Sequence, residues 1–259
     1  MEPTGPVAPE TLSDGRKTSP EYWNEVHRTP LREGLPSRLL VPTRNTIRLL
    51  RPHVSGGSRV LEIGFAPGKI LLWLAARGGA AVSGLDYSAP GVDAAGRLFA
   101  SCGVRADVRC EDLFATTFPE GAFDLVYSLG VVEHFADPRD AIRRHVRLAR
   151  PGGTAIVAIP NYGGAYGRLQ RALDPQNLAL HNLEIMSGRA LLAAAPDDLL
   201  SGARAYPFGR AHAALVSVGK RMPALVAKGI AWTANGLGLL QPADWPPLCP
   251  MLVLEMRRR

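Results

Sequence analysis

The chain has 259 residues, of which 46% are hydrophobic and 20% are charged, a balance typical of a globular protein with a sizeable core. No uninterrupted apolar run of about eighteen residues occurs, so we predict no membrane-spanning helix. The net charge of +7 lies largely in helix-spaced arginines over 138–151 and in the terminal Arg-Arg-Arg. A solvated helix face and an exposed terminus explain both, so the charge does not favour a nucleic-acid partner.

The N-terminus and the cysteines both bear on where the protein resides. Residues 1–18 are rich in Pro and Gly and carry no basic segment followed by an apolar run. We therefore expect a flexible tail over 1–18 and no secretory signal. Cys102, Cys110 and Cys249 form no Cys-x-x-Cys pair and suit neither a disulfide framework nor a zinc site. We expect free thiols in a reducing cytoplasm.

From residue 19 the chain is expected to form one domain. Short helices starting near Pro20, after Ser19, and near Pro42 form an N-terminal cap over 19–57. Strand-length apolar segments then alternate with helix-length segments, which predicts βαβ units and a doubly wound parallel sheet. The expected strands are 59–64, 81–88, 106–112, 123–130 and 154–161. The expected helices are 68–77, 90–101 and 138–149.

The remaining residues, 162–259, form the half of the domain expected to face a substrate. Residues 181–196 indicate a loop and then a helix, and 202–209 and 250–259 indicate a sixth and a seventh strand. Between these strands, 211–246 predicts two inserted amphipathic helices. They would roof an apolar substrate pocket, form a homodimer face or contact a membrane surface, and the sequence leaves all three open.

The segment LEIGFAPGK, residues 61–69, joins the first strand to the next helix through a glycine turn. A P-loop needs four residues between its glycines and a hydroxyl after the lysine, whereas three separate Gly64 from Gly68 and Ile70 follows. The dinucleotide motif would place further glycines at Ala66 and Lys69. Neither motif fits. An acid at the strand end, Glu62, with small residues after it suits the amino-acid part of a sulfonium ligand.

This segment resembles the first motif of class I S-adenosylmethionine-dependent methyltransferases. Ala66 replaces the middle glycine, which is sterically acceptable if its φ stays negative. Residues 123–138 and 148–161 are similar to the family's fourth-strand segment and to its approach to the fifth strand. The resemblance covers 58–161, the expected cofactor-binding core. It implies a Rossmann-like methyltransferase fold: a doubly wound, mostly parallel seven-stranded sheet with N-terminal capping helices and a helical insertion before the last strand.

The resemblance implies S-adenosyl-L-methionine as cofactor and S-adenosyl-L-homocysteine as product. Asp86 is placed to accept the ribose hydroxyls, and Asp112 with Leu113 resembles the adenine-contacting pair. Taken singly, the acids could be surface, helix-cap or loop residues, but three at one sheet edge would repel without a donor-rich ligand. The predicted cofactor-binding residues are Tyr22, Glu62, Gly64, Phe65, Ala66, Gly68, Asp86, Tyr87, Ser88, Glu111, Asp112, Leu113, Ser128, Leu129 and Gly130.

The implied reaction is displacement of a methyl group from sulfur by a substrate nucleophile. A hydroxyl nucleophile must lose its proton, which calls for a base with a pKa near neutrality. His134 is the predicted base or substrate-orienting group, Glu133 is its alternative and His181 is a second candidate. A structural role for His134, capping or fixing the following helix, stays open. No His and acid cluster appears at ligand spacing, so we expect metal-free chemistry.

The acceptor class follows from a motif that the sequence lacks. Enzymes of this class that methylate planar amines carry Asp/Asn/Ser-Pro-Pro-aromatic after the fourth strand, where this chain reads SLGV at 128–131. A hydroxyl, a carboxylate or an alkyl amine of a small molecule or glycan is therefore favoured, and our leading hypothesis is a hydroxyl oxygen in secondary metabolism or glycan modification. Two alternatives stay open: an RNA or protein methyltransferase that uses the basic surface, and a non-catalytic cofactor-binding protein.

Overall fold

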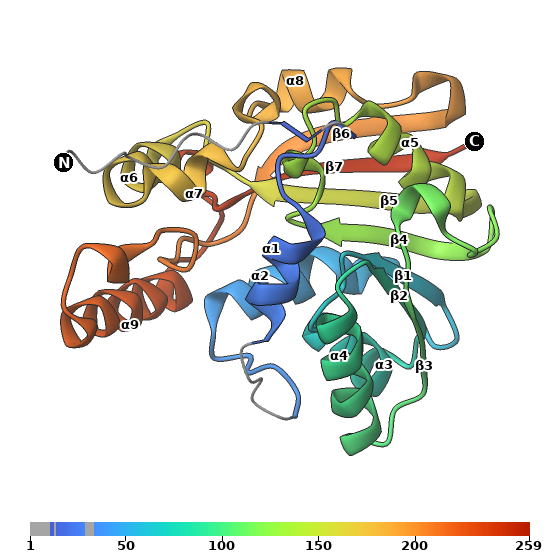
Figure 1. Cartoon of the computed structure of the whole chain (residues 1–259), viewed down its shortest axis with the longest axis horizontal. Coiled ribbons are helices and arrows are strands. Elements are labelled where there is room, and N and C mark those ends of the chain that lie inside the picture. Colours follow the sequence, from blue (N-terminus) through green and yellow to red (C-terminus); the bar gives the residue numbers. More distant parts are fainter. Residues whose placement is uncertain (1–10, 13, 29–33) are drawn as a thin grey trace.

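The computed structural model describes residues 11–12, 14–28 and 34–259 and contains one seven-stranded sheet in the order β3-β2-β1-β4-β5-β7-β6 (Figure 1). The pairs among β1 to β5 are parallel, and β7 runs antiparallel to both β5 and β6. The strands are β1 Arg59–Ile63, β2 Ala81–Asp86, β3 Ala106–Cys110, β4 Phe123–Leu129, β5 Ala149–Pro160, β6 Leu200–Phe208 and β7 Met251–Arg258. This confirms the predicted fold class.

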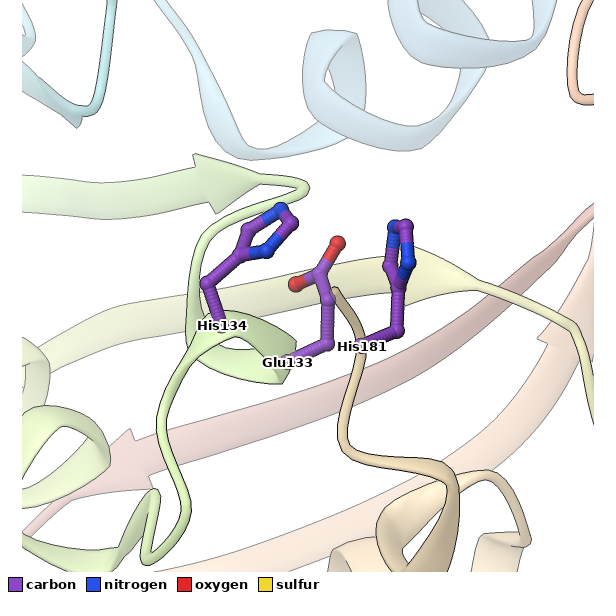
Figure 2. A group of neighbouring side chains, drawn as sticks. All are labelled: Glu133, His134 and His181. Atoms are coloured by element: carbon purple, nitrogen blue, oxygen red, sulfur yellow. The ribbon is translucent and has the colours of Figure 1, made fainter. Parts of the chain in front are cut away.

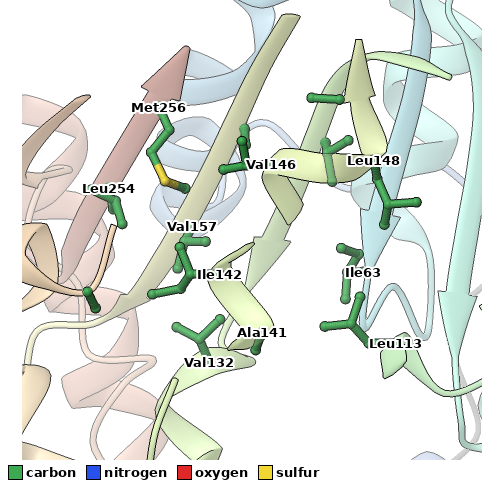
Figure 3. Close-up of a cluster of buried hydrophobic side chains, with 14 of the residues drawn as sticks. Ile63, Leu113, Val132, Ala141, Ile142, Val146, Leu148, Val157, Leu254 and Met256 are labelled. Carbon is green, nitrogen blue, oxygen red and sulfur yellow. The ribbon is translucent and has the colours of Figure 1, made fainter. Parts of the chain in front are cut away.

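Helices cover both faces of the sheet, which explains why its central strands are almost continuously apolar. On one face, α5 and α8 pack over the strands in the cluster that Figure 3 draws around Ile142 and Val157. On the other face, α2, α3 and α4 bury residues such as Leu50, Leu71 and Phe99. These helices are α2 Val41–Leu50, α3 Lys69–Gly78, α4 Ala89–Ser101, α5 Arg139–Leu148 and α8 Gly188–Ala193.

The predicted strands and helices of the core all occur, with ends that differ by a few residues. Helices α6 Ala165–Leu173 and α7 Pro175–Ala179 were not predicted. The insertion differs more, because it holds one long helix, α9 Ala224–Leu240, where two helices were predicted. Gly219 and Pro223 interrupt helical pairing before α9, and only a single 3-10 turn forms there. No helix in the described part of the chain combines the length and hydropathy that crossing a bilayer requires.

The N-terminal segment packs against the core earlier than the predicted boundary at residue 18. Lys17 donates its N–H to the carbonyl of His134 at 2.7 Å, and the carbonyl of Gly15 accepts from the N–H of Ala136 at 2.8 Å. Thr18 is buried. Residues 15–17 of the predicted flexible tail therefore have paired backbone, whereas residues 1–10 and 13 of that tail lie outside the described residues.

Helix α1 Pro20–His27 follows this segment and begins where the sequence predicted. The hydroxyl oxygen of Ser19 accepts the N–H of Tyr22 at 3.3 Å and caps the helix. Part of the predicted N-terminal cap, residues 29–33, lies outside the described residues. The segment 14–28 therefore places a capped helix, and an isolated β-bridge between Arg16 and Phe135, next to the carboxyl ends of β1 and β4 (Figure 1).

One close contact fixes the loop that follows β1. Phe65 is buried, and its ring lies so close to Gly84 of β2 that a Cβ built there would come within 2.6 Å of the ring. Because well-packed interiors resist added atoms, no residue larger than glycine fits at position 84 without moving the loop. The contact between Gly84 and Phe65 therefore fixes how closely the loop of residues 64–68 packs on the sheet.

We expect the Gly84→Ala variant to lose about 1–3 kcal/mol of unfolding free energy, because the added methyl group overpacks against Phe65. The matched control is Gly96→Ala on α4, where nothing lies within 4 Å of the added Cβ. Alanine favours helix over glycine, so this control should gain up to about 1 kcal/mol. Urea denaturation followed by circular dichroism measures both, and equal stability of the two variants would contradict the assignment.

Candidate active site

A pocket opens at the carboxyl ends of β1, β2 and β4, where the strand order reverses between β1 and β4. Open α/β sheets bind their ligands at this reversal point. The N-terminal segment closes one side of the pocket. The polar and small residues that line it from the strand ends are Gly64, Ala66, Asp86, Tyr87, Asp112 and Gly130, and those from the N-terminal segment are Arg16, Thr18, Trp23 and His27.

The turn after β1 needs glycine at two positions. Gly64 and Gly68 have φ of +67° and +76°, the left-handed region that other residues rarely adopt. A Cβ on Gly64 would also lie 2.5 Å from the side chain of Val131. Among the described residues only glycines have positive φ, so Ala66 meets the condition set for it. The turn thus brings bare backbone up to the pocket.

Asp86 connects this turn to the end of β2. Its two carboxylate oxygens accept the N–H of Ala66 at 3.1 Å and the N–H of Ser88 at 2.8 Å. Each oxygen keeps a further lone pair. Burial is the main cause that raises the pKa of Asp86, and the two N–H groups oppose that rise. Ser88 itself caps α4 by accepting the N–H of Gly91 at 3.3 Å, so it has the helix-cap role.

Asp112 also lines the pocket, and Arg16 holds its carboxylate in an ion pair. The Arg16 guanidinium lies over the rings of Tyr87, Phe114 and Phe135, with centroids 5.4–5.8 Å away. Such cation–π contacts stabilise a cation that is largely shielded from water. The sequence analysis missed Arg16, because nothing in a segment predicted as a tail indicates that it reaches a strand end 96 residues away.

The other predicted cofactor residues divide by position. The pocket lining includes Gly64, Ala66, Asp86, Tyr87, Asp112, Leu113, Leu129 and Gly130. Tyr22, Glu62, Phe65, Gly68, Ser88, Glu111 and Ser128 lie outside it. Glu111 bonds to Thr116 and Thr117 in its own loop. Tyr22 is 37% exposed, whereas its neighbour Trp23 lines the pocket.

Glu62 lies behind the pocket. It is buried and accepts the hydroxyl of Tyr127 at 2.8 Å from the adjacent strand β4. Burial raises the pKa of Glu62 to about 8, with the nearby Asp86 adding to the rise. At neutral pH this carboxyl group is therefore predominantly protonated in the free protein.

The three predicted catalytic residues lie together (Figure 2). One ligand-type atom from each of Glu133, His134 and His181 lies within 4.8 Å of the others. Asn182 joins the two segments, because its N–H donates to the carbonyl of Glu133 at 2.6 Å and its side-chain amide donates to Phe135 and Ala136. The fold therefore places His181 beside His134 although 46 residues lie between them in the sequence.

Backbone carbonyls determine which ring nitrogens of the two histidines carry hydrogen. His134 and His181 each place Nδ1 2.9 Å from a carbonyl, of Leu180 and Asn177 respectively. A carbonyl only accepts, so each Nδ1 carries the hydrogen and each Nε2 keeps its lone pair. Burial lowers the pKa of His134 to about 4 and also lowers that of His181. Both rings are therefore neutral at pH 7, and in the free protein the pKa of His134 lies below the near-neutral value that the sequence analysis called for in a base.

Glu133 is the third member of this group, and its pKa shifts in the opposite direction. It is buried, Oε2 has no hydrogen-bond partner within the described residues, and burial raises the pKa of Glu133 to about 8. At neutral pH this carboxyl is therefore predominantly protonated and uncharged beside two neutral imidazoles. Two imidazoles and a carboxylate are also ligands that divalent transition metals accept. The sequence analysis saw no such cluster, because its members come from separate segments.

Comparisons with known proteins agree with this geometry. Residues 61–157 match a family model described as "Methyltransferase domain". This match supports the class I S-adenosylmethionine-dependent methyltransferase domain that the sequence predicted for this part of the chain. A ubiquinone biosynthesis O-methyltransferase of Chelativorans sp. is 33% identical over 54% of this chain and 58% of that protein. Methyltransferase GfsG of Streptomyces halstedii is 30% identical over 42% of this chain and 40% of its own length.

The similarity to these relatives covers only part of their length, and a shared fold does not identify the reaction. The methyltransferase chain spans about half the length of the curated relatives it matches. A solved structure, the [4+2]-cyclase SpnF, aligns over 97% of both chains with a TM-score of 0.59 and 20% identity. This likeness shows the fold alone, since one fold hosts different chemistries. S-adenosylmethionine is the family's cofactor, and the site must decide the reaction.

The domain's cofactor affinity should depend on Asp86. We expect Asp86→Asn to keep the fold, because the amide oxygen still accepts one of the two N–H bonds. The variant should bind S-adenosylhomocysteine about a hundredfold more weakly, because hydrogen bonds to a charged acceptor contribute about 1.5–3 kcal/mol each. Titration calorimetry measures the affinity. Asp93→Asn, at an exposed position on α4, is the control. Unchanged affinity in Asp86→Asn would remove it from the cofactor site.

Stability of the free protein should fall as pH rises from 6.5 to 8. Burial lifts the folded-state pKa of Glu62 and of Glu133 from the ordinary 4.5 to about 8, so in this window the folded protein binds more protons than the unfolded chain. The buried histidines contribute below this window, because their pKa values are lowered. The urea concentration at the unfolding midpoint should fall less steeply with rising pH in Glu133→Gln than in the wild type. The exposed control Glu184→Gln should keep the full slope.

Proposed function

We propose that this chain transfers a methyl group from S-adenosylmethionine to a hydroxyl oxygen of a small-molecule acceptor. The observation that supports the proposal most strongly is that one pocket holds both Asp86 and the neutral imidazole of His134. A carboxylate suited to ribose hydroxyls and a base suited to an acceptor hydroxyl then line a single site.

The residues present fit the cofactor. Asp86 has lone pairs left to accept ribose hydroxyls, and the glycine turn offers backbone for the amino-acid part. Tyr87 and Leu113 offer apolar surface to the adenine. His27 keeps a buried Nδ1 with no partner in the described part of the chain, which is a further polar group facing the site. When bound, S-adenosylmethionine supplies an electrophilic methyl group on a positively charged sulfur.

His134 then acts as general base. Its Nδ1–H is held by Leu180, so its Nε2 is free to accept the proton of the acceptor hydroxyl. The edge of the Trp23 indole lies against the His134 ring, with centroids 5.2 Å apart, and shields it from water. His181, 4.8 Å away between centroids, provides a second neutral base beside it. Positioning and desolvation provide the remaining acceleration.

The acceptor side is suggested by position and by the relatives. His181 contacts Tyr162, which follows β5, with ring centroids 5.1 Å apart. His181 in turn contacts the His134 ring, and neither His181 nor Tyr162 is part of the cofactor-pocket lining. The names of the relatives, an O-methyltransferase of ubiquinone biosynthesis and methyltransferase GfsG, support a small-molecule acceptor. The segment SLGV supports oxygen over a planar amine.

The proposal predicts a specific defect in His134→Asn. The asparagine amide still reaches toward Leu180, so cofactor affinity should stay unchanged, while turnover should fall about 10²–10⁴-fold because the base is lost. Methyl transfer to a panel of hydroxylated metabolites measures turnover, and calorimetry measures affinity. His53→Asn, distant from the pocket, is the control. Full turnover in His134→Asn would assign that residue a structural role.

The same assay distinguishes the alternatives. Because the proposed proton transfer to His134 needs no metal, we expect a chelator to leave turnover unchanged. Loss of turnover that Mn²⁺ or Zn²⁺ restores would assign Glu133, His134 and His181 to a metal. Salt-sensitive methylation of tRNA in place of the panel would indicate the RNA methyltransferase. Cofactor binding without transfer to any acceptor class would indicate the non-catalytic protein.

A further inference from the structure

Helix α9 stands apart from the sheet, at one end of the molecule (Figure 1). From residue 221 to residue 233 every side chain but Ala227 is exposed, although most are apolar. Leu225, Trp232 and Leu240 are 83%, 70% and 82% exposed. A helix that is apolar on all sides is normally buried in a core or in lipid. The exposure of α9 therefore indicates a partner outside the chain.

This exposure belongs to a helix that is firmly attached at its C-terminal half. The side chain of Asn235 is buried; it accepts the N–H of Val41 at 2.8 Å and donates to the carbonyl of Leu39 at 2.9 Å. Gly238 packs so tightly that an added Cβ would lie 2.2 Å from the carbonyl oxygen of Ala211. The attachment also brings Leu39, 72% exposed, next to α9. These apolar residues define what we call the α9 surface: Leu39, Leu225, Val226, Trp232, Leu237 and Leu240.

The segments that form the α9 surface carry only positive charge, and Asp244, the acid that follows them, is already paired with Arg48. Residues 34–61 and 199–243 contain no Asp or Glu at all. Exposed cations flank the apolar residues: Arg38 and Arg44 near α2, and Lys220, Arg221 and Lys228 on and before α9. A groove between α2 and α9 is lined by Arg38, Arg44 and Arg210 together with Leu239. In a lipid bilayer, cationic side chains could contact anionic headgroups while the neighbouring apolar side chains contact the acyl chains.

The charge also argues against a second copy as the occupant. Two α9 surfaces brought face to face would place cations of both copies near one another with no acid from 34–61 or 199–243 to pair with them. An anionic bilayer instead receives the leucines and the tryptophan at its interface and attracts each Lys and Arg. We propose that the α9 surface docks the protein on anionic lipid, with α9 lying along the membrane surface.

Vesicle co-sedimentation tests this directly on the full chain. The wild type should sediment with phosphatidylcholine vesicles that contain phosphatidylglycerol and should bind pure phosphatidylcholine at least tenfold more weakly. Leu225→Glu and Trp232→Glu should each reduce binding at least tenfold without loss of helicity, because both positions are exposed. Lys228→Gln should reduce it about fivefold, the contribution expected of one cation near an anionic leaflet.

Matched substitutions elsewhere on the surface should leave binding unchanged: Leu192→Glu, an exposed leucine on α8, and Arg77→Gln, an exposed arginine on α3. Equal binding to charged and uncharged vesicles, or equal loss in these controls, would overturn the proposal. So would a dimer in light scattering that Leu225→Glu dissociates, because the α9 surface would then be a self-interface. Cofactor titration on the same variants reports on the methyltransferase site independently.

Discussion

The site depends on one hydrogen bond between two loops, from the N–H of Ala66 to the carboxylate of Asp86. Parallel pairing already aligns the ends of β1 and β2, since the N–H of Gly64 donates to the carbonyl of Leu85. The Asp86 bond then fixes the turn that leaves β1 relative to the residues that leave β2. Both the bare backbone at Gly64 and the free lone pairs of Asp86 face the pocket because of it.

Burial sets the protonation of the candidate catalytic group. A low-dielectric environment disfavours charge, so it raises the pKa of the Glu133 carboxyl and lowers that of the His134 imidazole. Both groups are therefore predominantly uncharged at pH 7, and the carboxyl oxygen Oε2 of Glu133 keeps no hydrogen-bond partner in the described part of the chain. An imidazole that is buried, neutral and oriented by Leu180 is suited to take a proton without first losing one.

The sequence predicted the part of the site that strand periodicity places. Gly64, Asp86, Asp112 and Gly130 each follow an apolar strand, so their position at one sheet edge could be worked out in advance. The part contributed by irregular segments could not. Arg16 and Trp23 reach the pocket only through the path of the N-terminal segment, and nothing in their local sequence encodes that path. The exposure of the apolar residues of α9 is likewise a property of tertiary packing. From its hydrophobic content alone, α9 would be predicted to be buried.

The convergence of three acids at one sheet edge looked, from sequence, too repulsive to exist without a cationic ligand. The fold resolves that repulsion with partners of its own. Glu62 is largely protonated and bonded to Tyr127, Asp86 accepts two backbone N–H groups, and Asp112 is paired with Arg16. Their roles toward a cofactor therefore differ. An adenine amine must compete with a guanidinium for Asp112, whereas ribose hydroxyls meet lone pairs of Asp86 that remain available. Asp86 is thus the acid on which recognition of the adenosyl group can begin.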